Sequence, residues 1–169
     1  SAVFVLPVCL LCACASMFDL GYWRQAAQPG AAAHVRLFLG LLCASLMALL
    51  AAQDGIAFLI AWEVMALSAF FLVTTEHQKA EVRAAGWIYL ASTHAGTLLL
   101  IAFFGCWNAA SGGFSLVPLA SGAPAATRDL LFGLALAGFG LKAGIVPLHF
   151  WLPVAHANAP SHVSAVMSG

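Results

Sequence analysis

Charged residues are what this sequence has least of. Lysine, arginine, aspartate and glutamate make up 7% of the 169 residues, whereas hydrophobic residues make up 63%. Soluble domains carry about 25% charged residues. A chain with so few charges cannot cover a surface that faces water, so the composition excludes a soluble globular domain and predicts a membrane protein. The formal net charge is zero, and without a cluster of lysine and arginine no nucleic-acid partner is expected.

Targeting signals and cofactor motifs are also missing. The chain begins at Ser1 with neither an initiator methionine nor a basic segment of the signal-peptide kind, and it ends within the apolar stretch Val163–Gly169. We therefore expect a single membrane domain over residues 1–169 that is truncated at both ends. The five cysteines lie inside apolar runs, where packing is their expected role. Because no flavin, nucleotide or iron–sulfur motif is visible, we predict no cofactor and no metal.

Long apolar runs are what the sequence does contain. A membrane-spanning helix needs about 20 predominantly apolar residues. Four runs of roughly that length and a shorter fifth predict an all-α, polytopic membrane helix bundle of about five spans, followed by the start of a further helix. The expected spans are about Ala2–Leu20, Val35–Ala52, Ile56–Thr74, Ala84–Trp107 and Leu130–Val146.

Basic residues are unevenly distributed over the connections between these runs. The first and third connections hold Arg24, Arg36, Lys79 and Arg83, whereas the second and fourth hold only Arg128. Because basic loops stay on the cytoplasmic side of a membrane, we expect the first and third connections to face the cytoplasm.

The fifth run ends in a stretch with three prolines, Pro147, Pro153 and Pro160. Each proline lacks a backbone N–H and blocks continuation of a helix, so we predict a discontinuous helix over Pro147–Pro160. Irregular backbone at membrane depth persists only where protein buries it or where it lines a water-filled cavity. Discontinuous helices of this kind hold ion sites in transporters.

Two ionisable residues lie inside the apolar runs: Glu63 in the third run, and Lys142 just before the break. A charge at the bilayer centre costs about 2.5–3.5 kcal/mol, so such residues face the protein interior, pair with one another and mark ion or proton paths. Gly140 and Gly144 flank Lys142 and should let another helix, or water, approach the amine. The alternative is a buried ion pair that only fixes helix packing.

Histidines are the other candidates. His94 lies in the middle of the fourth run, and His149, His156 and His162 surround the break. Imidazole titrates near neutral pH, which suits proton transfer. The three histidines at the break therefore predict a hydrated proton path, whereas a packing role is an equal alternative for His94.

Two segments resemble one known superfamily. Ala61–Ser68, AWEVMALS, resembles the glutamate-bearing helix of the antiporter-like subunits of respiratory complex I and its relatives. Leu141–Ser161, LKAGIVPLHFWLPVAHANAPS, resembles the lysine-bearing broken helix of the same superfamily. The segments WEVMALSAFFLV and STHAG most resemble the hydrogenase branch. This branch includes the large membrane subunit of formate hydrogenlyase and component B of hydrogenase four. Rivals are the sodium/proton antiporter D-type subunit and the complex I subunits M and N.

The resemblance implies half of an inverted-repeat transporter fold that couples redox energy to proton movement. It implies that Glu63 is the modulating carboxylate and that Lys142 is the proton-carrying amine, whereas the central and exit residues of the family and its second repeat fall outside this chain. The implied protein is a multi-pass subunit of a bacterial or archaeal inner membrane. It is not catalytic by itself, and its partners are lipid, other membrane subunits and a peripheral redox arm of an oxidoreductase complex.

Three alternatives to proton translocation stay open on the sequence. The transported ion could be sodium, because carboxylates and water serve either ion. The chain could be a structural membrane scaffold of a hydrogenase, although the presence of both Glu63 and Lys142 argues against it. A haem-binding cytochrome would need paired histidines on facing helices, and only His94 is clearly in mid-span.

Overall fold

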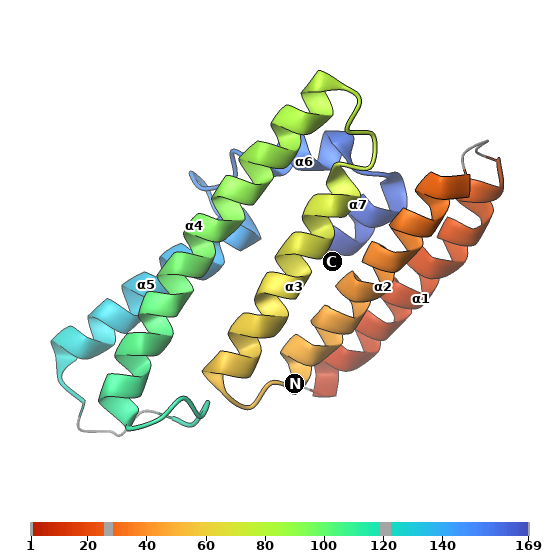
Figure 1. Ribbon diagram of the computed structural model, residues 1–169. Helices are drawn as coiled ribbons and strands as arrows, with labels where there is room; N and C mark the ends of the chain where they lie inside the picture. The colour runs from red at the N-terminus through yellow and green to blue at the C-terminus, as the bar shows by residue number, and fades with distance from the viewer. Residues whose placement is uncertain (1, 26–28, 119–122, 169) are drawn as a thin grey trace.

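The computed structural model describes residues 2–25, 29–118 and 123–168 and is helical in architecture, with no strand inside these ranges. This confirms the predicted all-α class. The elements, labelled in Figure 1, are α1 (Ala2–Gln25), α2 (Pro29–Ala51), α3 (Gly55–Val73), α4 (Ala80–Ser111), α5 (Ala125–Ala143), α6 (Leu152–Asn158) and α7 (Ser161–Ser168).

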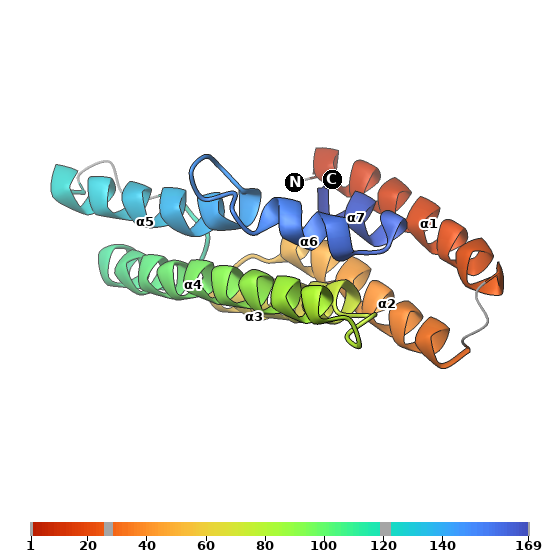
Figure 2. The same cartoon turned by 90° about the horizontal axis from the view of Figure 1, so that it is seen from above.

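Each long helix packs against the next one along the chain, most extensively α2 against α3 and α4 against α5. Seen from above, α2, α3 and α4 form one layer, and α5, α6, α7 and α1 form a second layer beside it (Figure 2). The two short helices connect the layers, because α6 contacts α4 and α3, and α7 contacts α3 as well as α1. The first and last helices of the chain are therefore neighbours.

Within the described residues, four helices are long and apolar enough to cross a membrane, and they match four of the predicted spans. Their apolar segments are Val3–Tyr22, Ala32–Ala51, Gly55–Val73 and Ala80–Ser111. The fifth predicted span, Leu130–Val146, falls on α5 and the turn after it. Arg128, Asp129 and Lys142 all lie within the 19 residues of α5, which makes α5 less apolar than the other four helices.

The helices extend beyond the apolar runs that predicted them. In the first expected connection, between the spans Ala2–Leu20 and Val35–Ala52, α1 continues to Gln25 and α2 already begins at Pro29, and residues 26–28 lie outside the described residues. Proline is well placed in the first turn of a helix, where its missing N–H is not needed. Likewise α4 begins at Ala80 and includes Glu81 in its first turn, where the helix dipole favours an acidic side chain.

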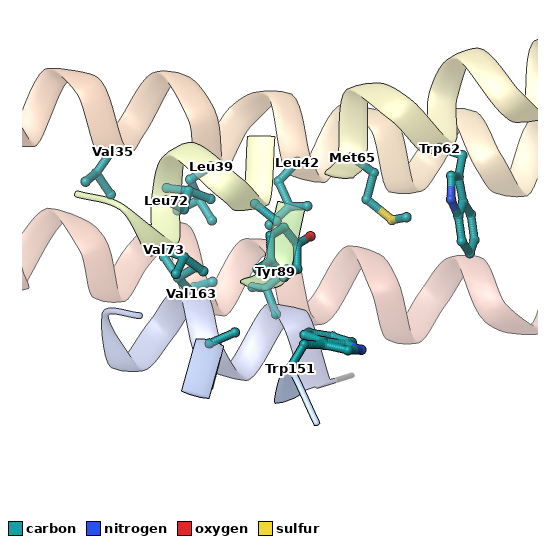
Figure 3. Close-up of a cluster of buried hydrophobic side chains, with 14 of the residues drawn as sticks. Val35, Leu39, Leu42, Trp62, Met65, Leu72, Val73, Tyr89, Trp151 and Val163 are labelled. Carbon is teal, nitrogen blue, oxygen red and sulfur yellow. The ribbon is translucent and has the colours of Figure 1, made fainter. Parts of the chain in front are cut away.

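A cluster of buried side chains holds the two layers together (Figure 3). It joins α2, α3 and α4 to the turn before α6 and to α7, and its members include Val35, Leu39, Leu42, Trp62, Met65, Leu72, Val73, Tyr89, Trp151 and Val163. Tyr89 and Val163 are both 0% exposed. The broken segment after α5 is therefore anchored in the apolar core by its own side chains.

Candidate functional site

The helix that carries Lys142 is discontinuous, as predicted. It ends at Ala143, and Gly144 follows in the left-handed conformation with φ +68°. The N–H groups of Gly144 and Ile145 both donate to the carbonyl oxygen of Gly140, which is a common way to end a helix at a glycine. The amine of Lys142 therefore lies in the last helical turn, where the carbonyl ends of the helix favour a cation.

Gly140 and Gly144 both face the segment that follows the break. A Cβ at Gly144 would lie 2.6 Å from Cδ1 of Leu152, and one at Gly140 would lie 3.5 Å from Cδ1 of Leu148. Both leucines belong to the segment that follows the break. Gly144 thus lets the start of α6 come close, whereas a Cβ at Gly140 would make an ordinary contact.

The three prolines hold different positions in the break. Pro147 lies in the turn between α5 and α6, and Pro160 lies between α6 and α7. Pro153 is in the first turn of α6, where a proline favours the start of a helix. Two of the prolines therefore separate helices, whereas Pro153 begins one.

The amine of Lys142 has a tyrosine as its partner. Its Nζ donates a hydrogen bond of 2.8 Å to the hydroxyl of Tyr89 on α4, and it lies 5.0 Å from the centroid of the same ring. Tyr89 is held in turn by Trp151, whose ring packs edge-on at 5.3 Å. The Trp151 indole N–H donates to the carbonyl oxygen of Leu141 at 2.6 Å. This circuit ties the end of α5 to the turn that follows it.

Glu63 has a histidine as its neighbour. Its Oε2 lies 3.6 Å from Nε2 of His94 on α4, and its Oε1 is buried and has no hydrogen-bond partner among the described residues. Nδ1 of His94 lies 3.0 Å from the carbonyl oxygen of Leu90. A carbonyl oxygen only accepts, so Nδ1 carries the hydrogen in this contact. The Nε2···Oε2 contact is then favourable when one proton lies between imidazole and carboxylate.

Glu63 and Lys142 do not pair directly. No salt bridge joins them among the residues that the structure describes, because α4 presents Tyr89 to the lysine and His94 to the glutamate. The ion pair expected from the sequence is thus replaced by two separate contacts on one intervening helix.

The three histidines around the break lie in three different environments. His149 is exposed in the turn between α5 and α6. Nδ1 of His156 lies 2.6 Å from the hydroxyl of Ser164, and Nε2 of His162 lies 3.1 Å from Oδ1 of Asp19 on α1. The side chains therefore do not form one histidine cluster.

The sequence reasoning missed two of these partners. Tyr89 stands in an apolar run, and nothing in the spacing pointed to Lys142. Asp19 is 1% exposed, and an aspartate inside the apolar run Ala2–Leu20 was the signal that could have revealed it.

Comparisons with known proteins match most of the chain to one family. Residues 52–169 match the family described as NADH:quinone oxidoreductase/Mrp antiporter, transmembrane. Hydrogenase-4 component B of Escherichia coli (strain K12) is 40% identical, over 100% of this chain and 25% of that protein. Formate hydrogenlyase subunit 3 of the same organism is 28% identical, over 99% of this chain and 26% of that protein. The chain spans about a quarter of the length of these curated relatives.

A solved structure has the same fold. A chain in respiratory complex I from Thermus thermophilus superposes with a TM-score of 0.78 at 21% identity, over 95% of this chain and 35% of that chain. This likeness confirms the predicted helix bundle with a discontinuous lysine-bearing helix. Together with the family match, it confirms the resemblance inferred from the segments around Glu63 and Lys142.

Proposed function

This chain belongs to the NADH:quinone oxidoreductase/Mrp antiporter transmembrane family, and from that premise we propose that it is part of a membrane subunit that moves protons with redox energy. One observation carries the proposal: the Lys142 amine lies at a helix break and is hydrogen-bonded to the neutral hydroxyl of Tyr89. A neutral acceptor positions an amine without adding a negative charge that would hold its proton. Lys142 can therefore act as a proton carrier.

In this proposal Glu63 modulates Lys142 from a distance. A carboxylate at about 4 Å stabilises a protonated amine by about 4 kcal/mol at an effective dielectric constant of 20, and at about 10 Å by about 1.7 kcal/mol. A displacement of a few ångströms, or a change of charge on Glu63, is then enough to switch the amine between holding and releasing its proton. The absence of a direct salt bridge between the two leaves room for such a change.

His94 provides the means to change the charge on Glu63. Its Nε2 faces Oε2 of the carboxylate at 3.6 Å, and both side chains are partly exposed at the surface of this chain. A proton that enters between imidazole and carboxylate neutralises Glu63 and weakens its hold on the Lys142 proton. The order of events is proton arrival at Glu63 and His94, followed by release at Lys142.

Driving this cycle requires energy from outside the chain. Each proton moved against about 100 mV costs about 2.3 kcal/mol. The proposed source is redox chemistry in a peripheral arm, transmitted by neighbouring membrane subunits. A hydrogenase component that is 40% identical to this chain over its whole length supports a hydrogenase-type complex as the host.

The test is proton uptake in membrane vesicles that contain the host complex with the subunit carrying this chain, normalised to redox turnover. Lys142→Ala and Glu63→Gln are compared with the wild type. Lys79→Ala and Glu76→Gln are matched controls, because that lysine and glutamate form an exposed salt bridge in the connection before α4. We expect the first two variants to lose more than about tenfold in uptake while assembly and both controls are unaffected.

Other outcomes point to the alternatives. Unchanged uptake in both Lys142→Ala and Glu63→Gln would leave the two residues as packing groups in a structural scaffold. Sodium is the second candidate ion, because carboxylates and water can serve either ion. Uptake of radioactive sodium that depends on Lys142, without matching proton uptake, would favour a sodium/proton antiporter subunit.

A further inference from the structure

A buried ionisable pair lies away from Glu63 and Lys142, where α1 meets α7. The Asp19 carboxylate is 1% exposed, and its Oδ1 lies 3.1 Å from Nε2 of His162, whose side chain is 2% exposed. His162 is the second residue of α7, in the segment that follows the break after Lys142. A buried carboxylate requires a hydrogen bond or an opposite charge to be stable, so this contact needs a physical explanation.

The atoms of this contact have hydrogen-bonding capacity that is not satisfied within the described residues. Neither Asp19 Oδ1 nor either ring nitrogen of His162 completes a hydrogen bond within the described residues. The other carboxylate oxygen, Oδ2, lies 3.3 Å from Nε of Arg36, whose side chain is 47% exposed. Asp19 is thus joined to a cation that reaches the surface and faces an imidazole that can still accept a proton.

The groups around the pair act on a cation at His162 in opposite directions: the Asp19 carboxylate favours it, whereas burial and the Arg36 guanidinium disfavour it. Arg36 approaches Asp19 from α2, and Tyr22 packs its ring 5.4 Å from the imidazole. Cys14 and His162 line one apolar recess of about 330 Å³ between α1 and α7. The side chains that α3, the other long helix on α7, buries include no titratable group. Within the described residues, Asp19 is the anion closest to His162, and the aromatic ring adds a favourable surface for an imidazolium.

We propose that Asp19 and His162 form a second proton-holding site of this subunit, separate from Glu63 and Lys142. The inference rests on proton translocation as the proposed function. A proton from water adds reversibly to a ring nitrogen of His162, and the imidazolium formed pairs with the Asp19 carboxylate. Release returns the proton to water and leaves Asp19 paired with Arg36. Because the partners lie on α1 and α7, each proton makes or breaks a charge pair that fastens the end of the broken segment.

The experiment uses the double variant Asp19→Asn/His162→Gln in the host complex. Asparagine and glutamine keep side chains of similar size that hydrogen-bond, but neither titrates. If the site exchanges protons, uptake per redox turnover falls more than about tenfold in complexes that assemble normally. Ser16→Ala is the control on the same helix, because its hydroxyl bonds to the Cys12 carbonyl oxygen within α1. Uptake at the wild-type level in the double variant overturns the proposal and leaves the pair a packing contact.

A spectroscopic readout does not depend on pumping or on the double variant. Nitrogen-15 NMR of histidine-labelled complex, with His162→Gln for assignment, should show the His162 ring passing from the neutral to the charged form as the pH falls below about 6.5, because burial disfavours the imidazolium. A ring that stays neutral throughout overturns the proposal even if the double variant fails to assemble. Lys142→Ala separates the two levels of inference. If it pumps like the wild type, the proposed function fails. If it stops pumping while the double variant continues, only the second site fails.

Discussion

The Lys142 amine and the Tyr89 hydroxyl lie 2.8 Å apart across the interface of α5 and α4, joined by a hydrogen bond. Tyr89 is fully buried, and within the described part of the chain no carboxylate forms a salt bridge with the lysine. The amine is therefore fixed in position by a group that does not fix its charge. This arrangement suits a residue that must gain and lose a proton in place.

Tyr89→Phe removes the acceptor and keeps the ring. Leaving a buried amine without its hydrogen-bond partner lowers the free energy of unfolding by about 1–3 kcal/mol. We therefore expect a lower Tm together with reduced proton uptake per redox turnover. Ser92→Ala is the control on the same helix, because that hydroxyl bonds only to the Ile88 carbonyl oxygen of α4. A Tyr89→Phe variant with wild-type Tm and uptake would contradict the role given to the hydrogen bond.

His94→Gln and Glu63→Gln test whether these two residues act as a unit. Each single variant removes one half of the contact at 3.6 Å, so we expect each to lower proton uptake. The effects of substitutions at two residues in contact are not additive. The double variant should therefore lose no more proton uptake than the more damaging single variant. His77→Gln, in the exposed connection before α4, is the matched histidine control. Losses that add up in the double variant would show that His94 and Glu63 act independently.

Gly144→Ala should destabilise the break. Gly144 has φ +68°, which costs a residue with a side chain about 1–2 kcal/mol, and the new Cβ would lie 2.6 Å from Cδ1 of Leu152. Gly133→Ala is the matched control inside α5, where a Cβ meets nothing within 4 Å and alanine favours the helix by about 0.5–1 kcal/mol. Thermal unfolding should give a lower Tm for the first variant and an equal or higher Tm for the second. The reverse order would show that the turn at Gly144 does not limit stability.

Asp54→Ala tests the start of α3, the helix that positions Glu63. Oδ1 of Asp54 accepts hydrogen bonds from the N–H groups of Ile56 and Ala57 at 3.0 and 2.9 Å. Loss of such a cap costs about 1 kcal/mol, which should appear as a small fall in Tm. Lys79→Ala is the comparison, because Lys79 holds the same position before α4 and makes no side-chain cap. An equal change in Tm for both variants would show that the Asp54 cap does not stabilise α3.

The four long spans and the discontinuous helix could be predicted from the sequence because their signals are local. Apolar runs of membrane length and prolines after Lys142 act on the segment that contains them. The ends of the helices were less accessible, because helical structure continues past the apolar run wherever nothing stops it. For this reason α4 extends over 32 residues and includes charged side chains.

The partners of the candidate residues could not be predicted, because they depend on which helix lies between which. Lys142 and Tyr89 are 53 residues apart, and the pairing of Glu63 with His94 follows from the position of α4 between α3 and α5. A single sequence places Glu63 and Lys142 in apolar runs and suggests that two opposite charges meet. It contains no signal that a tyrosine and a histidine on one helix would take both places.

The buried carboxylate of Asp19 also bears on how this protein is made. A lone aspartate in a helix that enters the bilayer costs about 2.5–3.5 kcal/mol at its centre, and His162 lies far later in the sequence, on α7. Arg36 follows Asp19 by only 17 residues and is available much earlier during translation. The consequence is that α1 and α2 should leave the insertion machinery together as a hairpin, with the arginine shielding the aspartate until α7 arrives.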